Sequence, residues 1–455
     1  MTLVVERQFW NVAAETISRP DMERLQWAKL ERQMRYVYEK SPYYRSKFDD
    51  CGTTPAKIRS LRDFRELPIF IDKLADRNTQ DASRENEGHP FGEYLCVSPR
   101  DVRAIHSTSG TTGVPVFEAF TEHDIGVQNE VLARTFWRAG LRPGDYVLHV
   151  TGLSMWLAGL VPMRAYEYMG MAGIPVGAES GAARVLDFAR LIRADGMFCI
   201  PSFADYILKK APEVAGVEAR ALGIRTILAV GEPGAGIPET RKRLSEGFGA
   251  QIFDSTGGIW GFGAVSCPHE QYQGMHLVCE DYHHLDIVEP DTKKPIDMSG
   301  GGGIGEMVHT ALEWEAGPAF RYGLGDLIEL ITDPCPCGLP GMRMKYKGRI
   351  DDLVIVKGVN VFPGAIKGVV ETFMPRVTGE MRIVLNAAPP RVEPPLRMKV
   401  EHGPAVTIEE LDGLREAIEN AISEKLRVRP AIELIPPNSL AKDPSKKVQF
   451  FEKNY

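Results

Sequence analysis

The stretch HSTSGTTGVP, residues 106–115, combines two glycines and five hydroxyl side chains in ten positions. Strand-like segments flank it, VRAI before and VPVFEAF after. A tight loop of this kind can turn consecutive N–H groups inward and form a nest for an anion, and the hydroxyls add further donors. No Gly-Lys-Ser/Thr sequence closes the loop, so it is not the P-loop of nucleotide triphosphatases. The stretch predicts a phosphate-binding loop, with a solvated hairpin turn as the alternative, because the same residues favour turns.

The segments that follow the loop alternate between strand and helix. The segment AARVLDFARLIRADG (182–196) has the pattern of an amphipathic helix, and DYVLHV (145–150), MFCIPS (197–202) and IRTILAVGEP (224–233) are short apolar strands. This alternation predicts an α/β body with a largely parallel sheet. From residue 351 we expect a separate small α+β unit, with a helix at 408–426. The expected domains are therefore 1–350 and 351–455.

Composition narrows the class of protein. The chain has 455 residues, a net charge of -7 and a sequence pI near 5.9. A nucleic-acid binder would usually present a basic face, so we expect no nucleic-acid partner. There is no run of about eighteen apolar residues, and the first twenty residues do not resemble a signal peptide. Seven cysteines without an export signal indicate reduced thiols. We expect a cytoplasmic protein with no membrane partner.

Two further segments carry potential ligand-binding groups. RYGLGDLIEL (321–330) places Asp326 between a turn and a strand, where a carboxylate could accept both hydroxyls of a ribose. KGRIDDLVIVKGVNVFP (347–363) combines cations, two adjacent acids, a strand and a glycine-containing turn. Either segment alone could be a surface loop. Their order and spacing relative to the loop at 106–115 are far more specific.

These segments together resemble the phenylacetate–CoA ligase group of the adenylate-forming enzymes. The resemblance runs from about residue 36 to the end and includes STSGTTGVPV, AVGEP, DSTGGIWG, RYGLGDL, GRIDDLVIVKGVNVFP and NSLAKDPSKK. It implies a large α/β body with a small mobile C-terminal lid. It also implies two steps: a carboxylic acid and ATP give an acyl adenylate and pyrophosphate, and coenzyme A then displaces AMP. ATP, Mg²⁺ and coenzyme A are the implied cofactors.

The resemblance also implies roles for individual residues. The β- and γ-phosphates would be held by Ser107, Thr108, Ser109, Gly110, Thr111, Thr112 and Gly113. Adenine would be lined by Gly231, Glu232 and Pro233, and the ribose would be held by Asp326 and Arg349. Other residues at the nucleotide would be Asp254, Ser255 and Thr256. Asp351 would be the hinge, and Lys357 and Gly358 would belong to the thiolation loop. Lys446 would be catalytic in the first step, between the substrate carboxylate and the α-phosphate. Trp156, Gly257 and Trp260 would lie at the acyl pocket.

The sequence departs from the family pattern at four positions. Val114 replaces a lysine, Thr256 replaces an aromatic residue, and Trp260 replaces an acid that helps to hold Mg²⁺. An indole cannot bind magnesium. The tail reads Ser-Lys-Lys instead of Gly-Lys, which leaves Lys447 as the alternative to Lys446. We expect the two tryptophans to narrow the pocket and to favour a short, branched or hydroxylated acid, such as 2-hydroxyisobutyrate. The alternative is that Trp260 points into the core and the pocket takes a small aryl acid.

A possible metal site lies outside these motifs. DPCPCGLP (333–340) places two cysteines two positions apart, and a cysteine and a histidine precede it. Thiolate and imidazole ligands suit tetrahedral Zn²⁺. The expected ligands are Cys267, His276, Cys335 and Cys337, with His269 and Cys279 as competitors. Reduced structural cysteines are the alternative, and a structural zinc in some relatives supports the metal.

Three functional hypotheses follow. The first is an AMP-forming acid–CoA ligase. The second is an adenylating enzyme that passes the acyl group to a carrier protein or an amine. The third is an inactive nucleotide-binding regulator, against which Asp326, Arg349 and Lys446 argue. Dimers are common in the family that the chain resembles, so a homodimer is an allowed assembly.

Overall fold

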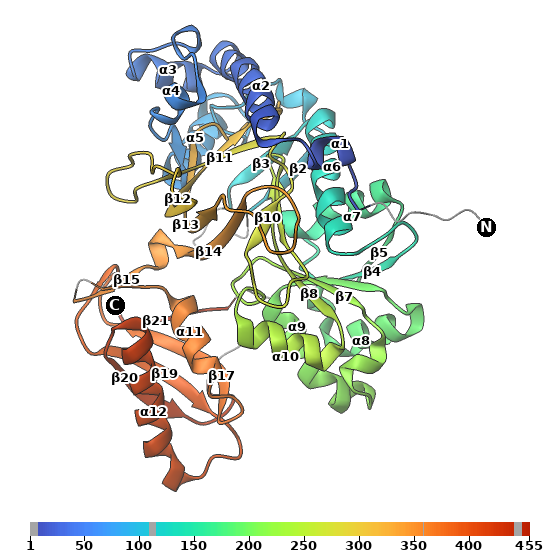
Figure 1. The fold of residues 1–455 in the computed structure, drawn as a ribbon, viewed down its shortest axis with the longest axis vertical. Helices are drawn as coiled ribbons and strands as arrows, with labels where there is room; N and C mark the ends of the chain where they lie inside the picture. Colours follow the sequence, from blue (N-terminus) through green and yellow to red (C-terminus); the bar gives the residue numbers. More distant parts are fainter. Residues whose placement is uncertain (1–7, 109–114, 358, 441–447) are drawn as a thin grey trace.

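The computed structural model describes residues 8–108, 115–357, 359–440 and 448–455. Its N-terminal part is helical. The helices are α1 (Val12–Glu15), α2 (Arg19–Lys40), α3 (Pro42–Asp50), α4 (Leu61–Arg65) and α5 (Lys73–Asn86). Helices α2, α3 and α4 lie at the top of Figure 1. Helix α2 begins after the N-cap Ser18 and ends at Ser41, whose side chain caps α3. None of the described helices is long and apolar enough to cross a membrane.

One twelve-stranded sheet forms the centre of the body. Its parallel part has the order β8-β7-β6-β4-β5 and consists of β4 (Tyr146–His149), β5 (Ala172–Pro175), β6 (Gly196–Cys199), β7 (Thr226–Val230) and β8 (Gln251–Ile259). The central strands β6 and β7 are buried at every position because helices cover both faces of the sheet. The covering helices are α6 (Glu122–Arg138), α7 (Leu157–Met169), α8 (Gly181–Ile192), α9 (Pro201–Lys210) and α10 (Pro238–Phe248).

The other half of the sheet is antiparallel. It continues from β8 through β9 (Phe262–Ser266), β10 (Met275–Leu277), β14 (Arg343–Arg349), β13 (Tyr322–Ile331), β12 (Gly302–Ala311) and β11 (His283–Val288). The short β1 (Ile71–Asp72) pairs in parallel with β13. The α/β class is confirmed, but parallel pairing along this path ends at β8, so the sheet is less parallel than expected. The hairpin from β8 to β9 is the reason, because a tight turn can join only antiparallel strands.

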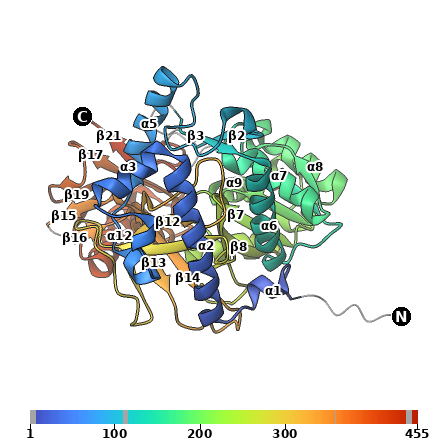
Figure 2. The same cartoon turned by 90° about the horizontal axis from the view of Figure 1, so that it is seen from above.

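The C-terminal unit has a hydrophobic core of its own. It contains β15 (Val354–Val356), α11 (Pro363–Glu371), β17 (Val377–Leu385), β19 (Leu396–His402), α12 (Ile408–Leu426), β20 (Pro430–Ile435) and β21 (Phe451–Lys453), with short strands β16 (Val359–Val361) and β18 (Arg391–Val392). One sheet has the order β20-β19-β17-β21, so the end of the chain is part of this unit. Seen from above, this unit and α8 lie on opposite sides of the molecule (Figure 2).

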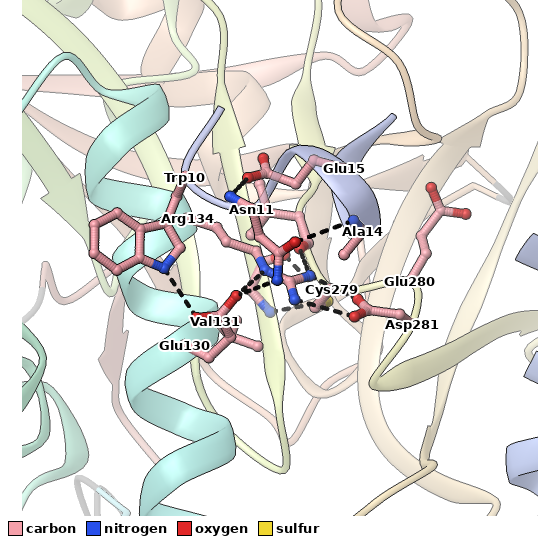
Figure 3. A network of polar contacts seen from close by, with 12 residues as sticks. Trp10, Asn11, Ala14, Glu15, Glu130, Val131, Arg134, Cys279, Glu280 and Asp281 are labelled. Carbon is pink, nitrogen blue, oxygen red and sulfur yellow. Dashed lines mark hydrogen bonds and ion pairs between the residues drawn. The ribbon is translucent and has the colours of Figure 1, made fainter. Parts of the chain in front are cut away.

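A buried polar network fixes the N-terminal segment to the body (Figure 3). Arg134 on α6 donates to both carboxylate oxygens of Asp281, at 2.7 and 3.0 Å, and to Glu130 at 3.0 Å. Glu130 in turn accepts hydrogen bonds from the side chains of Trp10 and Asn11, each at 2.9 Å. The Arg134 side chain is only 1% exposed, so its charge depends on these carboxylates.

Asp281→Ala is expected to lower the free energy of unfolding by about 3–5 kcal/mol, because it leaves the buried Arg134 without its bidentate partner. Urea denaturation measures this loss. The control is Asp21→Ala, which breaks an exposed ion pair with Arg24 and should cost about 1 kcal/mol or less. Equal, small losses in both variants would contradict a structural role for the network.

Candidate active site

The base of the predicted phosphate loop is an antiparallel hairpin of β2 (Ala104–Ser107) and β3 (Phe117–Phe120). The Ser107 N–H donates to the carbonyl of Met155 at 2.7 Å, and Thr108 N–H donates to the carbonyl of Val116 at 3.0 Å. Ser107 also forms a bridge with Trp156. The remaining predicted loop residues, Ser109, Gly110, Thr111, Thr112 and Gly113, lie outside the described residues, as does Val114. The segment at Met155 therefore holds the start of the loop in place.

Trp156 connects this loop to the predicted adenine turn, Gly231–Pro233. Gly231 has φ of +85°, and a Cβ atom there would lie 3.4 Å from two ring carbons of Trp156 and 3.5 Å from Ile200. The turn follows directly after β7, at the carboxyl end of the parallel part of the sheet. In open α/β sheets, ligands bind at this end of the strands. The fold thus brings two predicted nucleotide segments together around Trp156.

The predicted residues of β8 lie next to this turn. Asp254 accepts a hydrogen bond from the Tyr272 hydroxyl at 2.6 Å. Burial raises the pKa of Asp254 to about 6, although the Tyr272 hydroxyl and Arg241 act in the opposite direction. The Ser255 hydroxyl donates to the carbonyl of Ala264 at 2.9 Å, so its proton is already engaged within the sheet.

Gly257 is the glycine that the β8 hairpin requires. It has φ of +132°, and an added Cβ would lie 2.4 Å from the carbonyl oxygen of Phe262. Any other residue would force the two strands apart. Thr256 precedes it and is half-buried.

Trp260 does not share a cavity with Trp156. Its side chain is 4% exposed and packs in the core below the N-terminal helices, with ring centroids 4.8 Å from Tyr322 and 5.9 Å from His309. Trp156 packs against a different core cluster, that of β4, β6 and β7. The expectation that both indoles narrow one pocket therefore fails for Trp260, and the alternative orientation into the core is the one observed. The physical reason is the turn after β8, where Trp260 has φ of +54°.

The predicted ribose pair is assembled by strand register. Asp326 on β13 lies opposite Arg349 on β14, and the Arg349 guanidinium donates to Asp326 Oδ1 at 3.0 Å and to the carbonyl of Leu324 at 2.9 Å. Burial alone would lower the pKa of Arg349, but Asp326, Tyr346 and Asp351 together outweigh burial and raise it. Arg349 therefore stays charged and orients the carboxylate.

The predicted hinge and thiolation turn follow directly. Asp351 lies in a 3₁₀ turn, Ile350–Asp352, with an exposed side chain that accepts from Arg349 at 3.2 Å. Lys357 has φ of +50° between β15 and β16. Gly358, Lys446 and Lys447 lie outside the described residues.

The four predicted metal ligands converge in space. The ligand atoms of Cys267, His276, Cys335 and Cys337 all lie within 4.8 Å of one another. The Sγ atoms of Cys267 and Cys335 are 4.0 Å apart, and Cys337 Sγ is 3.4 Å from His276 Nε2. The pairing of β10 with both β9 and β14 brings these residues together. All seven cysteines are free thiols.

The surroundings favour these four ligands over the two competitors. His276 Nδ1 lies 3.2 Å from the carbonyl of Pro340, which directs Nε2 toward the sulfur atoms. Cys279 contacts Gly263, and His269 contacts Gln271. Neither competitor belongs to the cluster.

Sequence reasoning missed one buried carboxyl group, that of Glu118, and one contact of a predicted residue, Glu232. Glu118 on β3 is 5% exposed, and burial, together with the nearby Asp76, raises its pKa. Glu232 was expected only to line adenine, yet its carboxylate accepts the backbone N–H groups of Ser202 and Val448. No signal in the sequence marks the contacts of Glu232 with Ser202 and Val448, because both partners are backbone N–H groups.

Comparisons with known proteins agree with this arrangement. The family model of the AMP-binding enzyme C-terminal domain matches residues 358–454. A phenylacetate–coenzyme A ligase of Thermus thermophilus is 31% identical over 451 residues, covering 96% of this chain and 97% of the relative. A phenylacetate–coenzyme A ligase of Escherichia coli is 29% identical and covers 78% of this chain and 77% of the relative.

Solved structures of one ligase match along the full length of this chain. A 2-hydroxyisobutyryl-CoA ligase in its postadenylation state matches with a TM-score of 0.88 at 25% identity, over 100% of this chain and 94% of that chain. The same ligase in its thioesterification state covers the same shares at 26% identity, but with a TM-score of only 0.70. The arrangement of the present chain is therefore more similar to the former structure than to the latter. The chain belongs to the phenylacetate–CoA ligase family of the adenylate-forming enzymes and is an AMP-forming acid–thiol ligase.

Proposed function

We propose that the protein joins a small carboxylic acid to coenzyme A at the expense of ATP. A carboxylate oxygen attacks the α-phosphorus, and pyrophosphate leaves. The thiol sulfur of coenzyme A then attacks the acyl carbon, and AMP leaves with the electrons of the broken C–O bond. The observation that carries the proposal is the convergence of the phosphate-loop base, the adenine turn and Trp156 at the carboxyl ends of β4, β6 and β7. The free thiols fit a cytoplasmic enzyme.

The described residues would divide the work as follows. The turn at Gly231 would face adenine, and Asp326, oriented by Arg349, would accept the ribose hydroxyls. N–H groups of the phosphate loop would stabilise charge on the phosphates, since preorganised donors are most effective where negative charge develops. Trp260 stands at the position of the family's magnesium-binding acid and is buried. An indole does not fit Mg²⁺, so no side chain is assigned to this metal.

The acid is proposed to be either short and branched or hydroxylated, as 2-hydroxyisobutyrate is, or a small aryl acid such as phenylacetate. The support is the likeness to relatives named for both acids. Trp156 is half-buried between the loop base and Gly231, and it is the tryptophan that remains as a wall of the acyl pocket.

The test is acid-dependent ATP–pyrophosphate exchange over phenylacetate, benzoate, isobutyrate and 2-hydroxyisobutyrate. Trp156→Ala is expected to shift kcat/KM toward the larger acids by about 10- to 100-fold, because lost ring volume is worth about 1–3 kcal/mol of discrimination. Trp156→Phe is the matched control and should shift it less. An unchanged preference among the four acids would contradict the assignment of Trp156 to the acyl pocket. Exchange without acyl-CoA release from free coenzyme A would instead indicate a carrier protein or an amine as acceptor, and no exchange with any acid would indicate a regulator.

We also propose a structural zinc ion at Cys267, His276, Cys335 and Cys337. Tetrahedral zinc with Zn–S distances of about 2.3 Å and Zn–N distances of about 2.0 Å places neighbouring ligand atoms about 3.4–3.8 Å apart. The observed separation of 3.4 Å between sulfur and nitrogen lies within this range, and that of 4.0 Å between two sulfurs is slightly longer. The four ligand atoms, all within 4.8 Å of one another, would therefore need only a small contraction around the ion. The sulfur–sulfur separation does not fit a disulfide, which needs about 2.05 Å.

Protein purified without added zinc is expected to contain about one equivalent, because four protein ligands make one closed site. Cys337→Ser should lower this content and the temperature of unfolding together. Cys279→Ser is the control, since that thiol lies outside the cluster. A folded, active preparation without metal would contradict the proposal.

A further inference from the structure

The Glu232 carboxylate connects the body to the end of the chain. Its Oε1 accepts the N–H of Ser202 at 2.8 Å, and its Oε2 accepts the N–H of Val448 at 2.8 Å. Ser202 is the second residue of α9, so the first bond satisfies a free N–H at a helix N-terminus. Val448 precedes β21, which is paired to β17 in the C-terminal unit. One carboxylate thus bridges a fixed helix of the body and the tail of the lid.

The bridge belongs to one orientation of the C-terminal unit. A second contact lies nearby, where α11 packs against α10 (Figure 1). There the Thr240 hydroxyl donates to Glu371, and Arg243 is 4.0 Å from the same carboxylate. A Cβ atom added at Gly368 would lie 3.7 Å from Cγ2 of Ile237, so α11 approaches the residue that precedes α10 closely. These contacts link residues of the body to residues of the lid, so they must break if the lid rotates to another orientation.

We propose that Glu232 is a positioning residue that latches the lid in the orientation seen in this structure, and that adenylation takes place in this orientation. The inference rests on the proposed function and on the role that the family resemblance implies for Lys446 in the tail. Val448 is two residues from Lys446 in the sequence, so a bond to its N–H restrains the tail beside the adenine turn. The same bond has to be released before coenzyme A can react in the second orientation. Glu232 therefore acts through the position of the tail.

The chemistry of the carboxylate suits a releasable contact. Hydrogen bonds to a charged acceptor are stronger than neutral ones, yet a single bond remains easy to break. Burial raises the pKa of Glu232, whereas Ser202 and the N–H of Val448 lower it. A glutamine at this position separates the two functions of the side chain, which are to cap α9 and to bind the N–H of Val448. Its oxygen can still cap α9, but its NH₂ group would face the N–H of Val448, donor against donor.

Glu232→Gln is expected to lower acid-dependent ATP–pyrophosphate exchange by about 10- to 100-fold, the effect of losing one charge-assisted hydrogen bond. Conversion of supplied, saturating acyl-AMP to acyl-CoA should fall much less than pyrophosphate exchange, because the latch is open in that step. Hydrogen–deuterium exchange of the peptide 448–455 should become faster. The matched control is Glu246→Gln, which removes the same charge from the exposed end of α10 and should leave all three readouts unchanged.

Val448→Pro removes the same hydrogen bond from the other side, because proline has no N–H. It should also impair adenylation selectively. The double variant should be no worse than the more affected single variant, since both changes break one bond. Additive losses would overturn the latch, and so would adenylation that is unaffected by Glu232→Gln.

Glu232→Gln could also impair both half-reactions equally and speed up hydrogen–deuterium exchange in α9. That result would show that Glu232 only caps the helix, and it would likewise overturn the proposal. Failure of the proposed function can be distinguished from failure of the latch. In that case the unmodified protein would show no acid-dependent exchange of pyrophosphate, while deuterium exchange at 448–455 would still report whether Glu232 restrains the tail.

Discussion

Lys446→Ala is expected to lower adenylate formation by about 100- to 1,000-fold, the usual effect of removing one preorganised group that stabilises transition-state charge. In the first step a carboxylate approaches the anionic α-phosphate, and a cation between them offsets the repulsion. The second step brings a thiol to a neutral acyl carbon and has no such need. Supplied acyl-AMP should therefore still be converted to acyl-CoA at close to the normal rate. Acid-dependent ATP–pyrophosphate exchange and single-turnover thioesterification measure the two steps separately.

Lys447→Ala is the matched control, because it removes the same charge one position later. It should leave both half-reactions nearly intact. If Lys447→Ala instead lost adenylation and Lys446→Ala did not, the assignment would move by one residue. Equal loss of both steps in Lys446→Ala would show that the residue supports the fold of the tail, and it would contradict a role confined to the first step.

The parts of the site that the sequence predicted are those fixed by local pattern. The strands at 145–150 and 224–233 are runs of apolar residues that end in turns, and the structure has strands at Tyr146–His149 and Thr226–Val230. The helix expected at 408–426 has the observed bounds Ile408–Leu426, because Thr407 and Glu410 form a capping box there. Cysteine chemistry likewise marked the four clustered ligands before their geometry was known.

The parts that could not be predicted depend on distant pairing. Trp260 aligns with an acidic position, but the turn after β8 directs its ring into the core between Tyr322 and His309. Only the packing of β13 and β12 beside that turn decides this orientation. The contact from Glu232 to Val448 joins residues 216 positions apart through a backbone N–H, which every residue except proline has. A sequence pattern cannot single out such a partner.

Asp351→Pro is expected to separate the two half-reactions in the opposite direction from Lys446→Ala. Asp351 lies between β14, which carries Arg349, and β15, the first strand of the C-terminal unit, and we propose it as the hinge. It occupies the second position of a turn in which Leu353 N–H donates to the Ile350 carbonyl at 3.1 Å, a position where proline is favoured. Proline should therefore be compatible with the present orientation.

Proline at position 351 should destabilise the second orientation of the C-terminal unit. Hinge residues absorb large changes of φ and ψ, and the proline ring holds φ near about -65°. A backbone that cannot accept the ring is destabilised by about 3 kcal/mol or more, which corresponds to about 100-fold in the population of that orientation. Thioesterification of supplied acyl-AMP should fall by about this factor, whereas ATP–pyrophosphate exchange should be retained. Asp351→Ala is the control, because it removes the carboxylate that accepts from Arg349 but leaves the backbone free to rotate. If Asp351→Ala lost thioesterification as fully as Asp351→Pro, the ion pair with Arg349 would be the cause, and rotation about residue 351 would not be required.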